Sequence, residues 1–110
     1  MKAVFASLIV AGIAATALPA AAAVNAAAAN KALKANDCTK CHAIDKAKKG
    51  PSYKKVAAKY KDKPDAEEQL VKHLTSNPMV KLDDGTEEEH KAFKGNPDEL
   101  QNVILFILKQ

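Results

Sequence analysis

The stretch that decides the fold is Cys38-Thr39-Lys40-Cys41-His42, in the first half of a 110-residue chain. Its two cysteines are three positions apart, and His42 follows the second one directly. Thiols about one helical turn apart can both bond to one flat prosthetic group, while the adjacent imidazole reaches its metal from the same face. This C-x-x-C-H pattern is the attachment sequence for c-type haem. It predicts one haem c per chain, covalently bound by thioether bonds to Cys38 and Cys41, with His42 as proximal iron ligand.

A pair of cysteines at this spacing has other common uses, and none of them fits the surroundings. A thioredoxin-like motif opens a helix after a strand, and no strand pattern precedes Cys38. A structural zinc site needs a second Cys or His pair of comparable spacing, which the chain lacks. An exported protein would normally join two cysteines in a disulfide, but the histidine beside them favours haem.

The N-terminus has the layout of a secretory signal peptide. Lys2 is followed by an apolar stretch over residues 3–18 and by small residues from Pro19 onward. We expect a signal peptide over residues 1–23, cleaved between residues 20 and 26, and one domain over residues 24–110. The apolar stretch is short for a membrane span, so we expect a periplasmic protein with no span after cleavage. An uncleaved anchor is the alternative.

The basic residues are all lysines, and the formal net charge is +4. This excess is too weak and too scattered to indicate nucleic-acid binding. Several lysines surround the attachment segment and are suited to an acidic docking surface on a redox partner, namely Lys34, Lys40, Lys46, Lys48 and Lys49.

The expected domain over residues 24–110 is small. A domain of this size usually needs a covalent cross-link or a large prosthetic group to stabilise its core, and a haem would serve as that group.

Hydrophobic spacing and turn residues predict four helices and no strands, an all-α fold. The first three are expected over residues 26–35, 52–60 and 65–75, the third with Asp65 as N-cap and Glu68 as capping-box partner. Thr86 and Glu89 predict a further helical turn within residues 87–92.

The last helix has the clearest signals in the chain. Asn96 is its expected N-cap, Pro97 its first residue and Glu99 its third. An apolar stripe follows: Leu100, Val103, Ile104, Ile107 and Leu108.

From residue 30 to its end, the sequence resembles class I cytochrome c of the short bacterial periplasmic subgroup. The resemblance rests on C-x-x-C-H, on Gly50-Pro51 with its proline nine residues after His42, on the segment Tyr53–Tyr60 and on Pro97-Asp98-Glu99-Leu100. It implies a small cytochrome c fold of about four helices around one haem. It also implies that the Pro51 carbonyl accepts the second imidazole N–H of His42, which fixes the tautomer.

The same resemblance implies that the first and last helices cross at the haem edge. Ala29 and Leu33 would then lie against Leu100 and Ile104. Leu105 and Phe106, off the main stripe, would touch the haem or lie near the surface.

The sixth iron ligand has two candidates. Family members normally use a methionine, and Met79 is the only one outside the expected signal peptide, but it lies 17 residues before Asn96. His90 lies six residues before Asn96, close to where the family places its ligand. We favour His90 as the distal ligand and keep Met79 and an open site as alternatives. His73 is expected to be an exposed helix residue.

These features predict a monomeric single-electron carrier that serves redox proteins and is not an enzyme, because no general acid or base stands beside an open iron site. The alternative is a haem protein that binds or senses a small ligand by displacing its distal residue. A thioether ligand would raise the potential of the iron, whereas a second imidazole would lower it.

Overall fold

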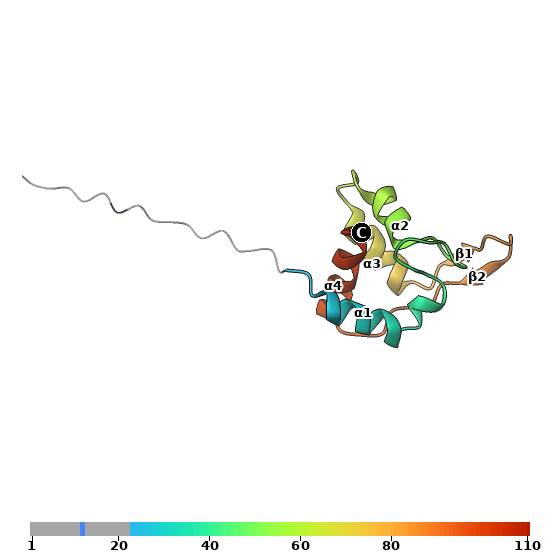
Figure 1. Cartoon of the computed structure of the whole chain (residues 1–110), viewed down its shortest axis with the longest axis horizontal. Helices are drawn as coiled ribbons and strands as arrows, with labels where there is room; N and C mark the ends of the chain where they lie inside the picture. Colours follow the sequence, from blue (N-terminus) through green and yellow to red (C-terminus); the bar gives the residue numbers. More distant parts are fainter. Residues whose placement is uncertain (1–11, 13–22) are drawn as a thin grey trace, which may run out of the picture.

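The computed structural model describes residue 12 and residues 23–110, so the expected signal peptide lies outside the described part except for residues 12 and 23. Four helices dominate the described chain and confirm the predicted all-α fold (Figure 1). In chain order the elements are α1 (Ala26–Ala35), the 3-10 turn η1 (Cys38–Lys40), α2 (Tyr53–Tyr60), α3 (Ala66–Thr75), β1 (Met79–Lys81), β2 (Glu87–Glu89) and α4 (Pro97–Leu108).

Side-chain caps explain where three of the helices begin. The Asn25, Ser52 and Asn96 side chains accept backbone N–H groups in the first turns of α1, α2 and α4. Asp65 stands at the predicted cap position of α3 but makes no cap hydrogen bond. Its carboxylate instead accepts from Gln69 Nε2 at 2.7 Å, so the expected capping box with Glu68 is wrong.

The helical turn expected within residues 87–92 is also wrong, because residues 87–89 form β2 of a short hairpin. Strand β1 pairs with it antiparallel, with Met79 opposite Glu89 and Lys81 opposite Glu87. Thr86 closes the turn: its backbone N–H and hydroxyl donate to Asp84 Oδ1 at 2.9 and 2.6 Å. A Thr that resembles a helix cap therefore supports a hairpin turn, and three-residue strands are too short to show alternation.

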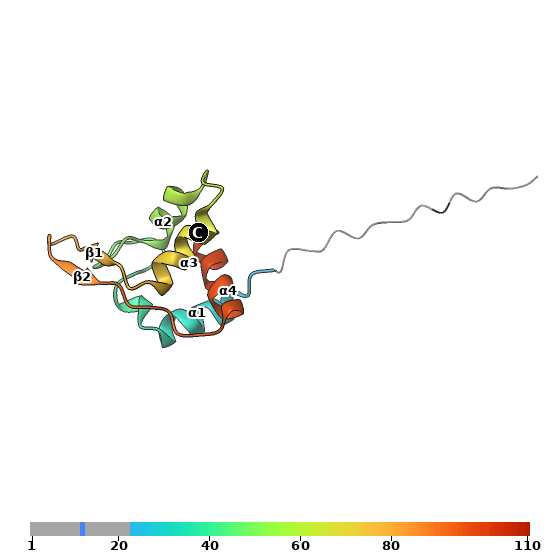
Figure 2. The same ribbon diagram turned by 180° about the vertical axis from the view of Figure 1, so that it is seen from behind.

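Helix α4 is the central packing element, since α1, α2 and α3 each contact it (Figure 2). Ala29 and Leu33 of α1 share one core cluster with Val103, Phe106 and Ile107 of α4. The expected pairing of first and last helices is therefore present, with Val103, Phe106 and Ile107 of α4 in the shared cluster in place of the expected Leu100 and Ile104. Phe106 is only 7% exposed, so it does not lie at the surface.

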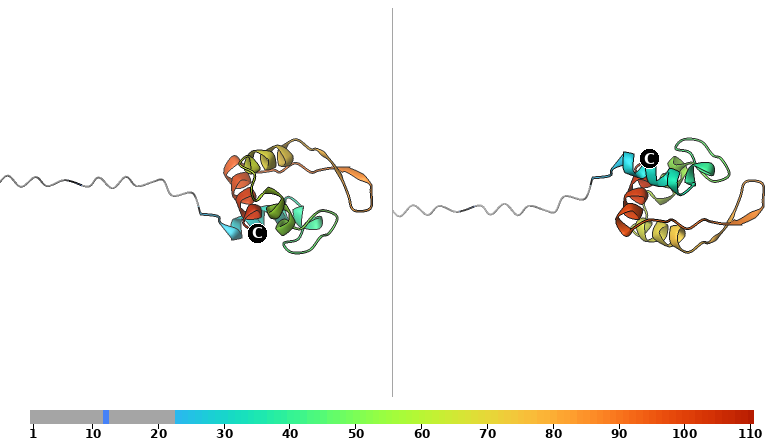
Figure 3. Two further views of the ribbon diagram at one scale, coloured as in Figure 1. Left: turned by 90° about the horizontal axis from the view of Figure 1, so that it is seen from above. Right: turned by 90° about the horizontal axis from the view of Figure 1, so that it is seen from below.

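Two parts of the chain extend from the same side of α4 (Figure 3). One part is α1 with the attachment segment and its following loop, and the other is α3 with the hairpin. None of the helices in the described residues is long and apolar enough to cross a membrane.

Candidate functional site

The attachment segment begins where α1 stops. Asp37 adopts a left-handed conformation with φ 60° and turns the chain into η1. The N–H groups of Cys41 and His42 both donate to the Cys38 carbonyl, at 3.2 and 3.0 Å. The two cysteines are not joined in a disulfide and are partly buried, and burial raises the pKa of the Cys38 thiol. This compact turn places two thiols and an imidazole within one short segment.

The His42 ring is oriented by the loop that follows it. Its Nδ1–H donates to the Pro51 carbonyl at 2.6 Å, which leaves Nε2 with a free lone pair for a metal. The loop is closed by Gly50 N–H donating to the Cys41 carbonyl at 2.8 Å and Tyr53 N–H donating to the Ala43 carbonyl at 2.9 Å. The backbone of this loop therefore determines which imidazole nitrogen is available.

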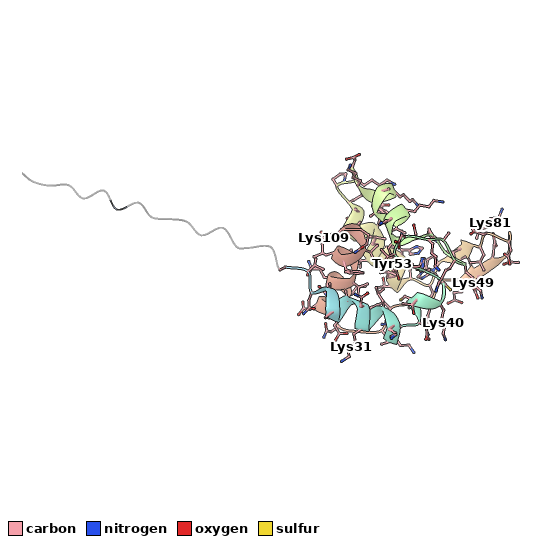
Figure 4. The ribbon with its side chains drawn as sticks, viewed as in Figure 1. Lys31, Lys40, Lys49, Tyr53, Lys81 and Lys109 are labelled. Atoms are coloured by element: carbon pink, nitrogen blue, oxygen red, sulfur yellow. The ribbon has the colours of Figure 1, made fainter. Side chains whose placement is uncertain are left out.

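Two neighbours confine the same ring. Tyr53, 5% exposed and central in the molecule (Figure 4), stacks on His42 with ring centroids 5.3 Å apart and an interplanar angle of 22°. Gly50 lies so close that a Cβ there would be 2.6 Å from His42 Cε1. The sequence analysis used Gly50 only as part of the Gly50-Pro51 pair, and the structure adds this steric role. Burial raises the pKa of the Tyr53 phenol.

His90 lies across from His42. The two ring centroids are 6.3 Å apart with their planes at 44°. The backbone N–H of His90 donates to the Pro78 carbonyl at 2.7 Å, and its ring Nδ1–H donates to the Lys91 carbonyl at 3.0 Å, so Nε2 is again the free nitrogen. Burial lowers the pKa of His90 and keeps the ring neutral, the form that binds metals.

His73 joins the site, although we expected it to be an exposed helix residue. It is partly buried on α3, and its ring centroid is 4.4 Å from that of His90. Burial also lowers its pKa. A sequence signal was present, because His73 is three residues after the buried Leu70 and so shares its helix face.

Met79, the other candidate ligand, is 62% exposed on β1. It stands directly opposite Glu89, so these two side chains share one face of the hairpin. His90, the next residue, pairs with Pro78 through its backbone and therefore belongs to the other face. The hairpin thus separates the Met79 and His90 side chains.

These residues fit an iron porphyrin better than a bare metal ion. Within the described part of the chain, no group of three or more His, Cys, Asp or Glu side chains could hold a metal ion. A porphyrin brings its own four nitrogens and needs only axial ligands and attachment points. The Tyr53 hydroxyl is buried without a hydrogen-bond partner in the described structure, as expected beside a site for a bound group.

Comparison with known proteins decides the family. The sequence matches the cytochrome c family over residues 26–110. The chain belongs to the cytochrome c family. Class 1 cytochrome MtoD from Sideroxydans lithotrophicus ES-1 is 48% identical, with a TM-score of 0.78 over 79% of this chain and 97% of that one. Wild-type cytochrome c552 from Nitrosomonas europaea is 26% identical, with a TM-score of 0.56 over 72% and 95%. No curated protein matches the sequence.

Membership of the cytochrome c family implies a covalently bound haem c, attached through Cys38 and Cys41. It also implies that this cytochrome is an electron carrier with redox proteins as partners. The predicted resemblance to class I cytochromes c agrees with the class printed for MtoD.

Proposed function

We propose that this protein is a periplasmic monohaem cytochrome c that carries single electrons, with His42 and His90 as axial ligands of the iron. The observation that carries the ligand assignment is the 6.3 Å separation of the two imidazole centroids. Imidazole nitrogens bind metals at about 2.0 Å, so two rings on opposite sides of one ion have centroids about 6 Å apart. Both rings also use Nδ1 in a hydrogen bond to a carbonyl, which leaves Nε2 for the metal.

Haem supplies a one-electron couple, and the residues around it keep its coordination constant. Pro51 holds the Nδ1–H of His42 and makes the imidazole a stronger donor. Gly50 and Tyr53 confine that ring from two directions. Restrained ligands suit an electron carrier because little of the protein has to move when the charge changes.

A low potential relative to a His/Met cytochrome follows from two imidazole ligands, because a second imidazole favours the oxidised iron. The rival function, binding or sensing of a small ligand, requires His90 to leave the metal. Hydrogen bonds to Asn36 and Leu74 and an ion pair with Asp37 hold the segment after His90, and they favour the carrier. This cytochrome therefore has a distal side built to stay closed.

The docking surface proposed for an acidic redox partner is narrower than the sequence interpretation assumed. Lys40 is paired with Asp37 at 3.3 Å, and Lys48 donates to the Thr39 carbonyl at 2.7 Å. Lys34, Lys46 and Lys49 make no ion pair within residues 23–110, so we assign them the attraction of a partner. Replacing all three with glutamine should slow electron exchange with an acidic partner at low salt and have little effect at high salt.

Spectroscopy of the purified ferric holoprotein tests the ligand assignment. The near-infrared charge-transfer band of an iron–sulfur bond should be absent from the wild-type protein. We expect His90→Met to create that band and to raise the potential. Met79→Leu is the matched control, because it replaces the other candidate by a residue of similar size at an exposed position, and its spectrum should equal that of the wild type. A wild-type band that disappears in Met79→Leu would assign the ligand to Met79 and refute this part of the proposal.

A further inference from the structure

The segment that follows His90 is tied to both sides of the proposed haem pocket. We call residues 90–95 the distal strap. Phe93 N–H donates to the Leu74 carbonyl at the end of α3, at 2.8 Å. Lys91 Nζ lies 2.6 Å from Asp37 Oδ2, next to the attachment segment. The strap therefore connects α3 with the chain just before Cys38.

The strongest of these ties comes from Asn36, whose side chain is buried, with 7% of the residue's surface exposed. Its Oδ1 accepts from Lys94 N–H at 2.7 Å, and its Nδ2 donates to the Lys94 carbonyl at 3.2 Å. Nδ2 also donates to the Ala32 carbonyl at 2.9 Å, within α1. One amide thus holds both backbone groups of Lys94 against the C-terminal end of α1, across 58 residues of sequence.

Asn36 is two residues before Cys38, and Lys94 is four residues after His90. The same amide therefore joins the start of the attachment segment to the segment that carries the proposed distal ligand. Because its bonds are partly buried, water replaces them less readily than bonds at the open surface. The Lys91–Asp37 ion pair lies at the surface, with side chains 55% and 42% exposed, and contributes less.

We propose that Asn36 is a positioning residue that keeps the distal strap closed and so sets how rarely His90 leaves the iron. The inference rests on the proposed function, since it assigns His90 to the metal. Loss of the amide would leave the N–H and carbonyl of Lys94 without these protein partners. The strap would then open more often, although the iron ligands themselves are unchanged.

The chain contains a matched control at the other end of α1. Asn102 of α4 makes the same two-bond clamp to backbone: its Oδ1 accepts from Asn25 N–H at 2.9 Å, and its Nδ2 donates to the Asn25 carbonyl at 2.9 Å. This clamp joins α1 to α4 and does not touch the distal strap. Asn102→Ala therefore removes the same pair of side-chain-to-backbone hydrogen bonds, at a more exposed site, without releasing residues 90–95.

The experiment measures how fast cyanide binds to the ferric holoprotein, because at saturating cyanide the rate is limited by departure of the distal ligand. We expect Asn36→Ala to bind cyanide about tenfold faster than the wild type, the factor for loss of its pair of partly buried hydrogen bonds to Lys94. The cyanide-binding rate of Asn102→Ala should stay within about twofold of the wild-type rate. Denaturant unfolding of both variants shows whether a difference in rate merely follows a difference in stability.

Equal cyanide rates for Asn36→Ala and Asn102→Ala would overturn the role of Asn36. If Asn36→Ala fails to yield holoprotein, Asn36→Asp replaces it. That variant keeps an acceptor for Lys94 N–H and loses the donor to the Lys94 carbonyl. Its cyanide-binding rate must also exceed that of Asn102→Ala. The ligand assignment fails separately: an unchanged ferric spectrum in His90→Ala would remove His90 from the iron, whatever the cyanide rates show.

Discussion

Gly50→Ala should distort the proximal side of the haem site. Gly50 has no left-handed φ, so its requirement is for space. A Cβ there would lie 2.6 Å from His42 Cε1 and 3.0 Å from Nδ1. Carbon atoms pack at about 3.5 Å, so the ring or the loop must move by about 0.9 Å. A shift of that size is enough to take the 2.6 Å bond between His42 and Pro51 out of hydrogen-bond range.

The cost of Gly50→Ala follows from these contacts. Overpacking costs about 1–3 kcal/mol. The lost hydrogen bond costs about 0.5–1.5 kcal/mol. Alanine also lowers the conformational entropy of the unfolded chain, which stabilises the folded protein by about 0.4–1 kcal/mol. A net destabilisation of about 2–3 kcal/mol should lower the melting temperature of a domain this small by roughly 10–20 °C.

The assay combines thermal unfolding of the holoprotein with its midpoint potential. Because the Pro51 bond makes His42 a stronger donor, its loss should also raise the potential. Gly85→Ala is the control: Gly85 has φ +85°, and a Cβ added there would have no atom within 4 Å, so the variant carries backbone strain alone. It should cost about 1–2 kcal/mol and leave the potential unchanged. A Gly50→Ala protein with wild-type stability and potential would refute the steric role of Gly50.

Two other substitutions test the core and the surface. Phe106 is 7% exposed, so Phe106→Ala should lower the free energy of unfolding in denaturant by about 3–5 kcal/mol. Leu105 is only partly buried, so Leu105→Ala should cost clearly less. Equal losses would contradict the assignment of Phe106 to the core. Hydrogen bonds from Lys91 and then Lys40 lower the pKa of Asp37 below 3.8. As the pH falls toward that value, the unfolded state binds a proton that the folded state does not, so the free energy of unfolding of the wild type should fall. Urea unfolding from about pH 5 to about pH 3 should show a shallower fall for Asp37→Asn. Equal pH dependence of stability in the two proteins would count against the ion pair.

Local signals were sufficient to predict the helices. Asn96, Pro97 and Glu99 define the start of α4, and Ser52 defines the start of α2, because a cap acts within one turn of its own residue. The hairpin was missed because its strands have three residues each. In addition, all three residues of its second strand are glutamates, and glutamate has a low β-propensity. Its turn depends on the hydrogen bonds between Thr86 and Asp84. In the sequence, Thr86 followed by Glu89 resembles the start of a helix.

Long-range features of the site were not readable in the same way. The hydrogen bonds between Asn36 and Lys94 join residues 58 positions apart, and the sequence around either residue does not predict them. The approach of Gly50 to His42 depends on how the loop closes. His73 was within reach of prediction, because its helical spacing from Leu70 places it on the buried face of α3.

The two edges of the proposed pocket differ, and the difference bears on how a small molecule could reach the iron. At the attachment edge, Asn36 and Asp37 hold the distal strap through partly buried hydrogen bonds and an ion pair. At the hairpin edge, Lys48 and Lys49 face Asp83, Asp84, Glu87 and Glu88 across a cleft of about 570 Å³. No ion pair spans that cleft in the part of the chain that the structure describes.

Opposite charges that attract across water without forming a fixed bond allow the hairpin to move at little cost, and salt weakens that attraction. Opening at the hairpin edge would displace β1 and β2 first, whereas His90, whose N–H donates to the Pro78 carbonyl at the base of the hairpin, is also held by the strap that follows it. The strap contacts beyond His90 stay in place during such a movement. Access for external ligands should therefore depend on salt much less than on Asn36, because the buried clamp, rather than the charged cleft, restrains the residue that must leave the metal.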